Sequence, residues 1–432
     1  MVSVKTVKGF ARAVFMLRLR ITIFFHYLPL WVKGQLGFRR FILFFRRLLL
    51  VFNACSENKF VRVGGQTRMH LYIPAVPSRA YITACDKLLR FDEKLPPQAL
   101  VCAITSACRF NCEHCYQKLD KGAQDVALDR LTDAVRQIQD LGVSYIIFEG
   151  GDPFLSYERL RTLCQTVDHR SELWVFSTGD RMTLERLQEL KDLNLAAVTF
   201  SMHSPEEKEH NKFVKSDRGW EIMDRGISMC HRAGIPIAFN MCLGKEAYYN
   251  GDFEKMMNRA KDFGGAIIQL IHPKPAGGWL ECGVPPFSKD DIAHVKSLVK
   301  QYNLGRGYEA YPSISAQVME EDAERFGCTA GGTERIYINA KGDVQPCEFL
   351  NISFGNIGHE SFDRIYERMR SHFKTACTGW LCQDYSREIL RVYRENQLKS
   401  LPLDPELSEQ VCRNWDRGRP TPLYERIEMQ LR

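Results

Sequence analysis

Between residues 99 and 303 the chain alternates short apolar runs with amphipathic helical patterns, and this alternation restricts the fold more than any other feature. The runs typical of strands are 99–104, 145–148, 173–176, 197–201, 236–242 and 266–271. The helical patterns are 128–141, 157–167, 184–193, 220–233, 253–263 and 292–302. Successive strand–helix units with apolar strands indicate a parallel sheet covered by helices. Right-handed crossovers curl such a sheet into a barrel or partial barrel, and we expect a site at the carboxyl ends of its strands.

A polar loop with three cysteines, Cys108, Cys112 and Cys115, follows the first predicted strand. Soft sulfur ligands at this close spacing select iron–sulfur clusters, zinc or Cu(I). A structural zinc site requires a fourth ligand, and the only nearby candidate, His114, stands between two of the cysteines. A cubic [4Fe–4S] cluster held by three thiolates keeps one iron open for a small molecule. The loop therefore predicts a metal site and favours an open-cornered cluster over zinc.

The spacing Cys108-x3-Cys112-x2-Cys115, with Tyr116 directly after it, resembles the signature of the radical S-adenosylmethionine (radical SAM) enzymes. The resemblance implies a [4Fe–4S] cluster on the three cysteines, SAM on the fourth iron, and Tyr116 beside the cofactor. In that family, reductive cleavage of SAM yields a 5′-deoxyadenosyl radical that abstracts hydrogen from a substrate. The family's TIM-like partial (β/α)6 barrel agrees with the predicted strand–helix units. The resemblance also implies a reducing electron donor such as a flavodoxin or ferredoxin.

A second motif, Gly150-Gly151-Asp152-Pro153, directly follows the second predicted strand. Glycines at such a position let the backbone approach a ligand closely. The motif is similar to the family's Gly-Gly-Glu-Pro motif, which implies that these four residues bind the methionine amino group of SAM. Asp152 stands where the family usually has Glu. The carboxylate is retained, but its reach is one methylene shorter.

Polar residues at the ends of later strands are further candidates for the site. Ser201 ends the fourth predicted strand, and the resemblance implies that it contacts the SAM carboxylate or ribose. Asn240 lies on the fifth strand and is predicted to face the same site. Each of these residues also has a purely structural interpretation. We interpret His203 as a histidine on the rim of the site, and we assign no acid–base residue.

The C-terminal region contains a second set of cysteines: Cys328, Cys347, Cys377, Cys382 and Cys412. The first two flank Gly342, and a hairpin of strands 335–339 and 344–347 brings them within reach of each other. The Cys-x13-Gly-x4-Cys spacing resembles the SPASM auxiliary-cluster domain or its shorter form, twitch. The later cysteines are sparser than in a full SPASM segment, which favours one auxiliary iron–sulfur cluster over two. Five cysteines exceed four ligands, so one is spare, and a zinc site is the alternative.

The positive net charge of the chain, +7, comes from its N-terminus. Residues 1–56 contain ten Lys or Arg and no acid, which leaves 49 basic and 52 acidic residues in the remainder. The body of the protein is therefore not basic, and we predict no binding to nucleic acid. The 15 cysteines of so long a chain are typical of metal ligation in a reducing cytoplasm.

The N-terminal 56 residues combine this positive charge with apolar runs. The longest uncharged run, 21–32, holds 12 residues, fewer than the ~18–20 needed to span a bilayer. Lys33, Arg40 and Arg47 recur every seven residues, so on one helix they share a face. This pattern is typical of a helix that lies in a membrane interface with its cations at anionic headgroups. We predict a cytoplasmic protein attached to the inner face of the cell membrane, with a signal peptide or a helix packed on the protein's own core as alternatives.

These features predict a membrane-associating leader (1–56), an irregular bridge (57–98), a radical SAM barrel (99–303) and a cysteine-rich C-terminal domain (304–432). The predicted fold class is α/β, with a TIM-like partial barrel and an N-terminal amphipathic helical leader. The predicted function is reductive SAM cleavage followed by hydrogen abstraction from a lipid or membrane-linked substrate. A maturase of ribosomally made peptides is the second hypothesis. A membrane-anchored iron–sulfur electron carrier or sensor is the third, although it has no need for the glycine motif at 150–153.

Overall fold

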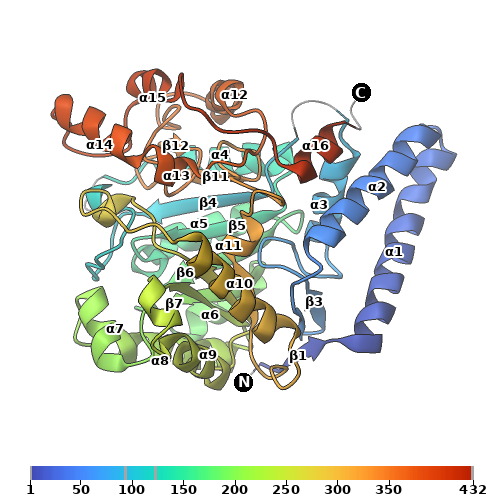
Figure 1. Cartoon of the computed structure of the whole chain (residues 1–432), viewed down its shortest axis with the longest axis horizontal. Helices are drawn as coiled ribbons and strands as arrows, with labels where there is room; N and C mark the ends of the chain where they lie inside the picture. The colour runs from blue at the N-terminus through green and yellow to red at the C-terminus, as the bar shows by residue number, and fades with distance from the viewer. Residues whose placement is uncertain (1, 92–94, 121–123, 430–432) are drawn as a thin grey trace.

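The computed structural model describes residues 2–91, 95–120 and 124–429, and a nine-stranded sheet lies at its centre (Figure 1). The strand order is β10-β9-β8-β7-β6-β5-β4-β11-β12. Its strands are β4 (Ala99–Thr105), β5 (Tyr145–Gly150), β6 (Glu172–Ser177), β7 (Leu195–Ser201), β8 (Ile237–Cys242), β9 (Ile267–Ile271), β10 (Ser313–Ala316), β11 (Arg335–Ile338) and β12 (Val344–Gln345). Neighbours pair in parallel except β11 and β12, which form an antiparallel hairpin. The predicted parallel α/β sheet is confirmed.

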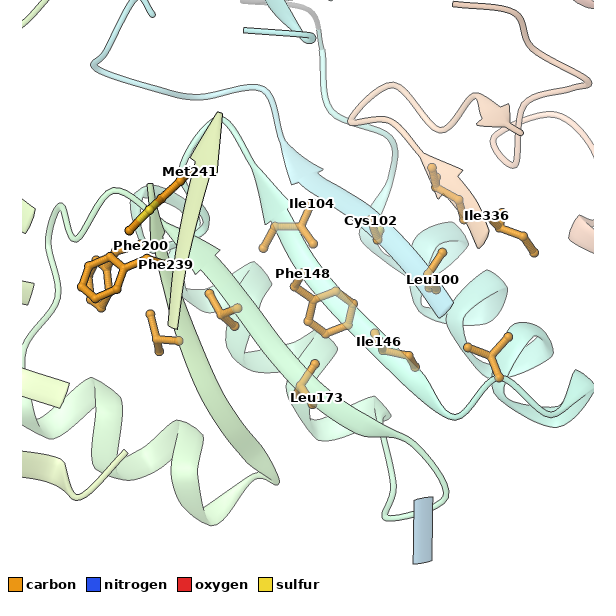
Figure 2. Packing of buried hydrophobic residues seen from close by; sticks show 14 of the residues in the cluster. Leu100, Cys102, Ile104, Ile146, Phe148, Leu173, Phe200, Phe239, Met241 and Ile336 are labelled. Atoms are coloured by element: carbon orange, nitrogen blue, oxygen red, sulfur yellow. The ribbon is translucent and has the colours of Figure 1, made fainter. Parts of the chain in front are cut away.

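Helices cover the outer face of the sheet. They are α4 (Leu128–Leu141), α5 (Tyr157–Thr166), α6 (Leu184–Asp192), α7 (Glu207–Val214), α8 (Gly219–Ala233), α9 (Asp252–Asp262) and α10 (Lys289–Leu304). Outward-facing strand side chains such as Leu100, Cys102 and Phe148 pack against these helices (Figure 2). Inward-facing residues of the same strands, such as Val101 and Ile147, belong to a separate buried cluster inside the curved sheet. Burial on both faces explains why the strands read as continuous apolar runs.

The segment before β4 closes the amino end of the sheet. This segment, predicted as an irregular bridge, contains β2 (Phe60–Val63), β3 (Gln66–Arg68) and α3 (Arg79–Leu89), and β2 also pairs with β1 (Val4–Val7). Glu172, at the start of β6, forms a buried ion pair with Arg68. It also accepts hydrogen bonds from Trp174 Nε1 (2.7 Å) and Ala75 N (2.8 Å). This packing closes the amino end of the barrel interior, so the interior is reached from the carboxyl end of the strands.

The main sheet continues beyond residue 303, where the sequence predicted a domain boundary. Strand β10 pairs with β9, and β11 pairs with β4, so the C-terminal region extends both edges of the sheet. The remaining C-terminal helices are α11 (Gln317–Glu320), α12 (Phe362–His372), α13 (Leu381–Asp384), α14 (Ser386–Glu395), α15 (Pro405–Cys412) and α16 (Pro422–Glu428). The cysteine-rich region is therefore joined to the barrel through backbone hydrogen bonds.

The N-terminal leader folds as two helices, α1 (Gly9–Val32) and α2 (Phe38–Ala54), with α2 lying between α1 and α3 (Figure 1). The ring of Tyr27 in α1 meets that of Phe44 in α2 edge to face, with centroids 4.6 Å apart, and the Tyr27 hydroxyl donates to Asp86 of α3 (2.7 Å). One side of the leader is therefore packed on the rest of the protein. This agrees with the alternative interpretation of the leader as a helix packed on the protein's own core.

The prediction that Lys33, Arg40 and Arg47 share one cationic face is wrong. Lys33 caps α1 and lies outside α2, so the three residues do not belong to one helix. Lys33 and Arg40 are exposed, whereas Arg47 is fully buried and donates to the carbonyls of Leu88 (3.2 Å) and Ile427 (3.1 Å). Arg47 therefore joins α2 to α3 and α16 instead of facing headgroups.

Helix α1 is long and apolar enough to cross a membrane, by length and composition. The helix is longer than the uncharged run 21–32 because it also includes Arg18 and Arg20. Core helices of soluble proteins and signal sequences pass the same two criteria.

Replacing Arg47 with methionine is expected to destabilise the protein by about 2–4 kcal/mol, because buried carbonyls lose their donor. The neighbouring Arg46 is exposed, and Arg46→Met should change the free energy of unfolding by no more than ~0.5 kcal/mol. Urea unfolding followed by circular dichroism measures both. Equal effects of the two substitutions would contradict the packed position of Arg47.

Candidate active site

A cavity of about 130 Å³ opens at the carboxyl end of the sheet. Its walls come from the cysteine loop after β4 and from the ends of β5, β6, β7 and β8. Eight predicted site residues line it: Cys108, Cys112, Cys115, Tyr116, Gly150, Gly151, Ser201 and Asn240. The fold thus brings together candidates that are up to 132 positions apart in the sequence.

A glycine turn after β9 packs directly on the cysteine loop. Gly278 N donates to the Cys115 carbonyl (3.0 Å). A Cβ on Gly277 would lie only 2.2 Å from Tyr116 Cα, and a Cβ on Gly278 would lie 2.1 Å from the Glu113 carbonyl oxygen. Larger residues would push the turn and the loop apart, so the turn helps to hold the cysteines in place.

Gly150 and Gly151 bring the end of β5 equally close to the cysteine loop. Gly151 N donates to the Thr105 carbonyl (2.8 Å). A Cβ on Gly150 would meet that carbonyl oxygen at 2.4 Å, and a Cβ on Gly151 would meet the Ala107 carbonyl oxygen at 2.1 Å. The glycine pair therefore sets the distance between β5 and the loop that bears the cysteines.

Asp152 and Pro153 support the cavity without lining it. Asp152 is buried and accepts hydrogen bonds from Phe154 N (3.0 Å), Thr178 N (2.8 Å) and Ser177 Oγ (2.9 Å). Burial raises the pKa of Asp152 to about 6, although these hydrogen bonds oppose the rise. Ser177 and Thr178 do line the cavity, so Asp152 acts by orienting them. A direct contact of Asp152 or Pro153 with SAM stays a prediction.

Ser201 and Asn240 face the cavity from two neighbouring strands, where they are paired in register. Asn240 Oδ1 is buried and has no hydrogen-bond partner within the part of the chain that the structure describes. A buried acceptor without a partner costs ~1–3 kcal/mol, and a ligand that donates to it removes this cost. The site therefore fits a ligand with an ammonium or hydroxyl group, as SAM has.

Glu149, which the sequence analysis did not assign, also lines the cavity. It is hydrogen-bonded to the hydroxyl of Tyr116. Burial raises the pKa of Glu149 to about 8 and that of Tyr116 well above its ordinary value. The Glu149 carboxyl group therefore retains its proton in most molecules at neutral pH. Glu149 directly follows the predicted strand 145–148, and this position could have identified it as a candidate for the site.

Three histidines line one wall of the cavity, and of these the sequence analysis had placed only His203 at the rim of the site. His114, His203 and His210 line the cavity, and the rings of His114 and His203 have centroids 4.6 Å apart. Burial lowers the pKa of His114 and of His210 to about 4, and that of His203 well below its ordinary value. The three imidazoles are therefore neutral at physiological pH. His210 could not be placed from the sequence, because the helix that carries it, α7, was not predicted.

A wider cleft of about 660 Å³ adjoins this cavity, and both are lined by Lys118 and His203. Most of its walls are aromatic or aliphatic: Phe213, Ala247, Trp279, Val284, Pro285 and Phe287. Three lysines, Lys118, Lys215 and Lys245, stand among these side chains with two glutamates. The volume is in the usual range for organic ligands, and the lining suits a molecule with both apolar and anionic parts.

Three of the five C-terminal cysteines come together. Cys328, Cys347 and Cys382 line a small cavity of about 20 Å³, with Glu321 and Trp380 in its walls. Within the described ranges of the chain, no group of three or more His, Cys, Asp or Glu side chains converges closely enough for a single metal ion.

The other two C-terminal cysteines do not line that cavity. The Cys377 carbonyl accepts from Cys328 N (2.8 Å), which places its backbone beside the group. The Cys412 thiol lies 3.7 Å from His372 Nδ1. The structure thus separates the five candidates into a group of three and two neighbours.

Comparison with known families agrees with this geometry. The chain matches the radical SAM superfamily over residues 102–260 and SPASM, an iron–sulfur cluster-binding domain, over residues 328–384. It belongs to the radical SAM superfamily, as an enzyme with a C-terminal SPASM domain. Its cofactors are SAM, the [4Fe–4S] cluster of that superfamily and auxiliary iron–sulfur centres of the SPASM domain. The predicted family, fold class, enzyme class and cofactors are confirmed.

Relatives with this architecture act on different substrates. The chain is similar to the AdoMet-dependent heme synthase of Nitratidesulfovibrio vulgaris, with 23% identity over 290 residues that cover 63% of this chain and 78% of the relative. It is also similar to the PqqA peptide cyclase of Rhizobium meliloti, with 20% identity over 371 residues that cover 78% and 91%. The crystal structure of Streptococcus suis SuiB bound to precursor peptide SuiA aligns with a TM-score of 0.53 and 14% identity over 66% of this chain and 69% of that one. At that identity the match shows the fold alone.

Replacing Asp152 with asparagine should destabilise the protein by ~1–3 kcal/mol, because an amide group would face backbone and hydroxyl donors. The substitution should also loosen Ser177 and Thr178, which line the SAM cavity, and thereby weaken SAM binding. Urea unfolding and equilibrium dialysis of SAM measure the two effects. Asp192→Asn, at an exposed position of α6, is the matched control, and an equal effect there would contradict the supporting role of Asp152.

Proposed function

We propose that this enzyme cleaves SAM reductively and abstracts hydrogen from an amphiphilic, lipid or membrane-linked substrate at the inner surface of the cell membrane. The observation that supports the membrane location is the exposed apolar face of α1 and α2. The amphipathic cleft beside the SAM cavity supports the class of substrate.

In this proposal Cys108, Cys112 and Cys115 hold the [4Fe–4S] cluster, which supplies the electron for SAM cleavage when it is reduced. Asn240 accepts a hydrogen bond from SAM, and Ser201 contacts its carboxylate or ribose. The backbone of Gly150 and Gly151 approaches the methionine moiety because neither residue has a side chain. In the C-terminal domain, we assign auxiliary cluster ligation to the group Cys328, Cys347 and Cys382.

The substrate occupies the wider cleft, with its reacting carbon turned toward the SAM cavity at His203. A neutral imidazole there separates the two spaces without adding a charge. Trp279 and Phe213 exclude water from the radical's path, which prevents side reactions. The lysines of the cleft, Lys118 among them, attract an anionic group of the substrate.

The leader presents an extended apolar surface to solvent. Ten of the thirteen most exposed large hydrophobic side chains described belong to it: Phe10, Leu17, Ile21, Phe24, Phe25, Trp31, Val32, Phe38, Ile42 and Leu49. On α1 the spacing of Leu17, Ile21 and Phe25 by four residues places them on one face. Figure 1 shows α1 at the edge of the molecule, away from the sheet. Exposed apolar patches of this kind mark interaction sites.

Cations surround this apolar surface. The exposed basic residues of the two helices and their turn are Arg18, Arg20, Lys33, Arg39, Arg40 and Arg46. Each is expected to contribute about 1 kcal/mol near an anionic bilayer. Apolar side chains flanked by Lys and Arg fit the interface of a membrane with anionic lipids.

Maturation of a ribosomally made peptide is the second candidate function. It is favoured by the similarity to PqqA peptide cyclase and by the fold shared with SuiB, whose structure contains a precursor peptide. A peptide with apolar and acidic side chains suits the same cleft. The third hypothesis, an electron carrier or sensor, loses support because the chain belongs to an enzyme superfamily.

Cys112→Ala should abolish 5′-deoxyadenosine formation, because the cluster loses one of three protein ligands. The assay is anaerobic incubation with SAM and reductant, followed by mass spectrometry. Cys230→Ala is the matched control, since Cys230 is a buried core residue of α8. Full 5′-deoxyadenosine production by Cys112→Ala would overturn the assignment of the triad.

Replacing Leu17, Ile21 and Phe25 together with glutamine should weaken binding to anionic vesicles by roughly 100-fold, at about 1 kcal/mol of lost burial each. Flotation with phosphatidylglycerol vesicles measures binding, and 5′-deoxyadenosine formation in solution should stay unchanged.

The control for the vesicle experiment removes three exposed hydrophobic side chains outside the leader, Tyr249, Leu304 and Met429. Their replacement with glutamine should leave vesicle binding unchanged. If both triple variants still float with vesicles, the leader is not the membrane-binding surface of the protein, and the peptide hypothesis gains support.

A further inference from the structure

A second cavity of about 130 Å³ lies at the opposite end of the sheet from the SAM cavity. Its walls come from α2, α3, the amino end of β4, the loops around β11, and α16. Figure 1 shows α2, α3 and α16 side by side in this part of the molecule. The volume corresponds to about ten water molecules, which is room for one ring and the start of a chain.

Apolar side chains from both leader and body form the outer part of this cavity. Leu48, Val51 and Phe52 of α2 face Ala84 and Leu88 of α3 across it. An apolar cavity of this size favours an apolar ligand over water.

The apolar wall lies directly beneath the exposed apolar surface of the leader. Leu48 lines the cavity and is 3% exposed, whereas the next residue, Leu49, belongs to the exposed surface and is 41% exposed. The two residues are consecutive in α2, so their side chains point about 100° apart around the helix axis. A lipid chain in a membrane under α2 is therefore within a helix diameter, about 10 Å, of the cavity.

The inner end of the cavity is polar, and both of its cations among the described residues are paired with carboxylates. Lys87 pairs with Glu334, and Arg335 pairs with Glu321 (3.7 Å) and more closely with Glu348 (2.7 Å), which leaves no unpaired cation for an anionic ligand. Neutral side chains such as Tyr72, Gln98 and Thr329 line the same end. This lining suits an uncharged headgroup with carbonyl oxygens better than a phosphate or carboxylate, which requires a cation.

The polar end also adjoins the group of three C-terminal cysteines. Glu321 and Thr329 line both this cavity and the one that contains Cys328, Cys347 and Cys382. The SAM cavity is distant, because the two cavities lie at opposite ends of β4, whose seven residues span about 20 Å. A molecule bound here is thus next to the auxiliary centre and far from the carbon that loses hydrogen.

We infer that this cavity binds a membrane quinone, with the ring at the polar end and the isoprenoid chain between α2 and α3. An uncharged, redox-active headgroup accounts for the paired charges, the neutral donors and the wall shared with the cysteines. An apolar tail accounts for the outer lining and for its continuity with the leader surface. The inference rests on the proposed auxiliary ligands Cys328, Cys347 and Cys382.

Cys328, Cys347 and Cys382 would hold the auxiliary centre, which would supply a one-electron path from the substrate to a quinone bound in this position. When a substrate radical loses a proton and forms a closed-shell product, it releases one electron. A quinone takes up two electrons and two protons, so one quinol forms for every two turnovers. The reaction is therefore an oxidation of the substrate, and the membrane quinone pool is its electron acceptor.

Binding of decylubiquinone to the full chain, measured by anaerobic equilibrium dialysis, tests the site. Ala84→Trp fills the cavity from α3 and should weaken binding by roughly tenfold or more. Val51→Trp fills it from α2 and should have the same effect, which guards against misfolding of either variant. Arg79→Trp, at an exposed position of α3 outside the cavity, should leave binding unchanged. Absent binding, or equal binding in all four proteins, would overturn the inference.

Palmitate distinguishes the quinone from an acyl lipid, because it shares the apolar chain and carries a carboxylate. Palmitate binding as tight as that of decylubiquinone, and equally sensitive to Ala84→Trp, would replace the quinone by a fatty acyl ligand. Weak palmitate binding supports the quinone.

Electron transfer is measured in the Cys112→Ala background, where the auxiliary centre is observed without SAM chemistry. Electron paramagnetic resonance of the chemically reduced centre should decay on addition of decylubiquinone, with the appearance of quinol. The decay should slow by roughly tenfold or more when Ala84→Trp is added, in proportion to the lost binding. A decay rate independent of Ala84→Trp would overturn the electron-transfer role. Vesicle flotation and SAM cleavage do not depend on this result, so its failure is distinct from failure of the proposed function.

Discussion

The backbone hydrogen bonds between the glycine turn after β5 and the loop after β4 determine the geometry of the active site. Gly151 N and Asp152 N donate to the carbonyls of Thr105 (2.8 Å) and Ala107 (2.7 Å), directly before the first cysteine. These bonds form only because no Cβ occupies the space between the two segments. The second glycine turn, after β9, packs on the cysteine loop from the other side. The loop is thereby held between two turns, and the parallel sheet sets the spacing of both.

The two ends of the sheet have different chemistry. The carboxyl end contains polar side chains without partners, such as Asn240, and titratable groups whose pKa burial has shifted. The amino end is closed by Arg68 and Glu172, whose charges are buried together. Because a buried charge is tolerated only when it is paired and hydrogen-bonded, this end is sealed against water. The cavity for which we propose a quinone lies at this end of the sheet, and the SAM cavity lies at the other.

The leader is the part of the chain on which the proposed membrane attachment depends. One side of α2 is buried on α3 and on α16 through Arg47, and the other side presents Ile42 and Leu49 to solvent. The helix is thus part of the folded body and not a detachable anchor. The exposed residues Ile42 and Leu49 and the cavity-lining residues Leu48, Val51 and Phe52 thus belong to the same helix.

The amino-acid sequence is enough to predict the parallel sheet, the cysteine triad and the glycine motif, because each depends on local periodicity or on close spacing along the chain. It placed the strands from β4 to β9 within two residues of their observed bounds, since strands buried on both faces leave a continuous apolar signal. The directions of individual side chains, by contrast, follow from the tertiary fold. The fold turns Arg47 inward and Asp152 behind the cavity, and it places Glu149 in the cavity wall. It also separated Cys377 and Cys412 from the other cysteines. These outcomes depend on contacts between segments far apart in the chain, and no local pattern encodes which face of a helix or turn meets another segment.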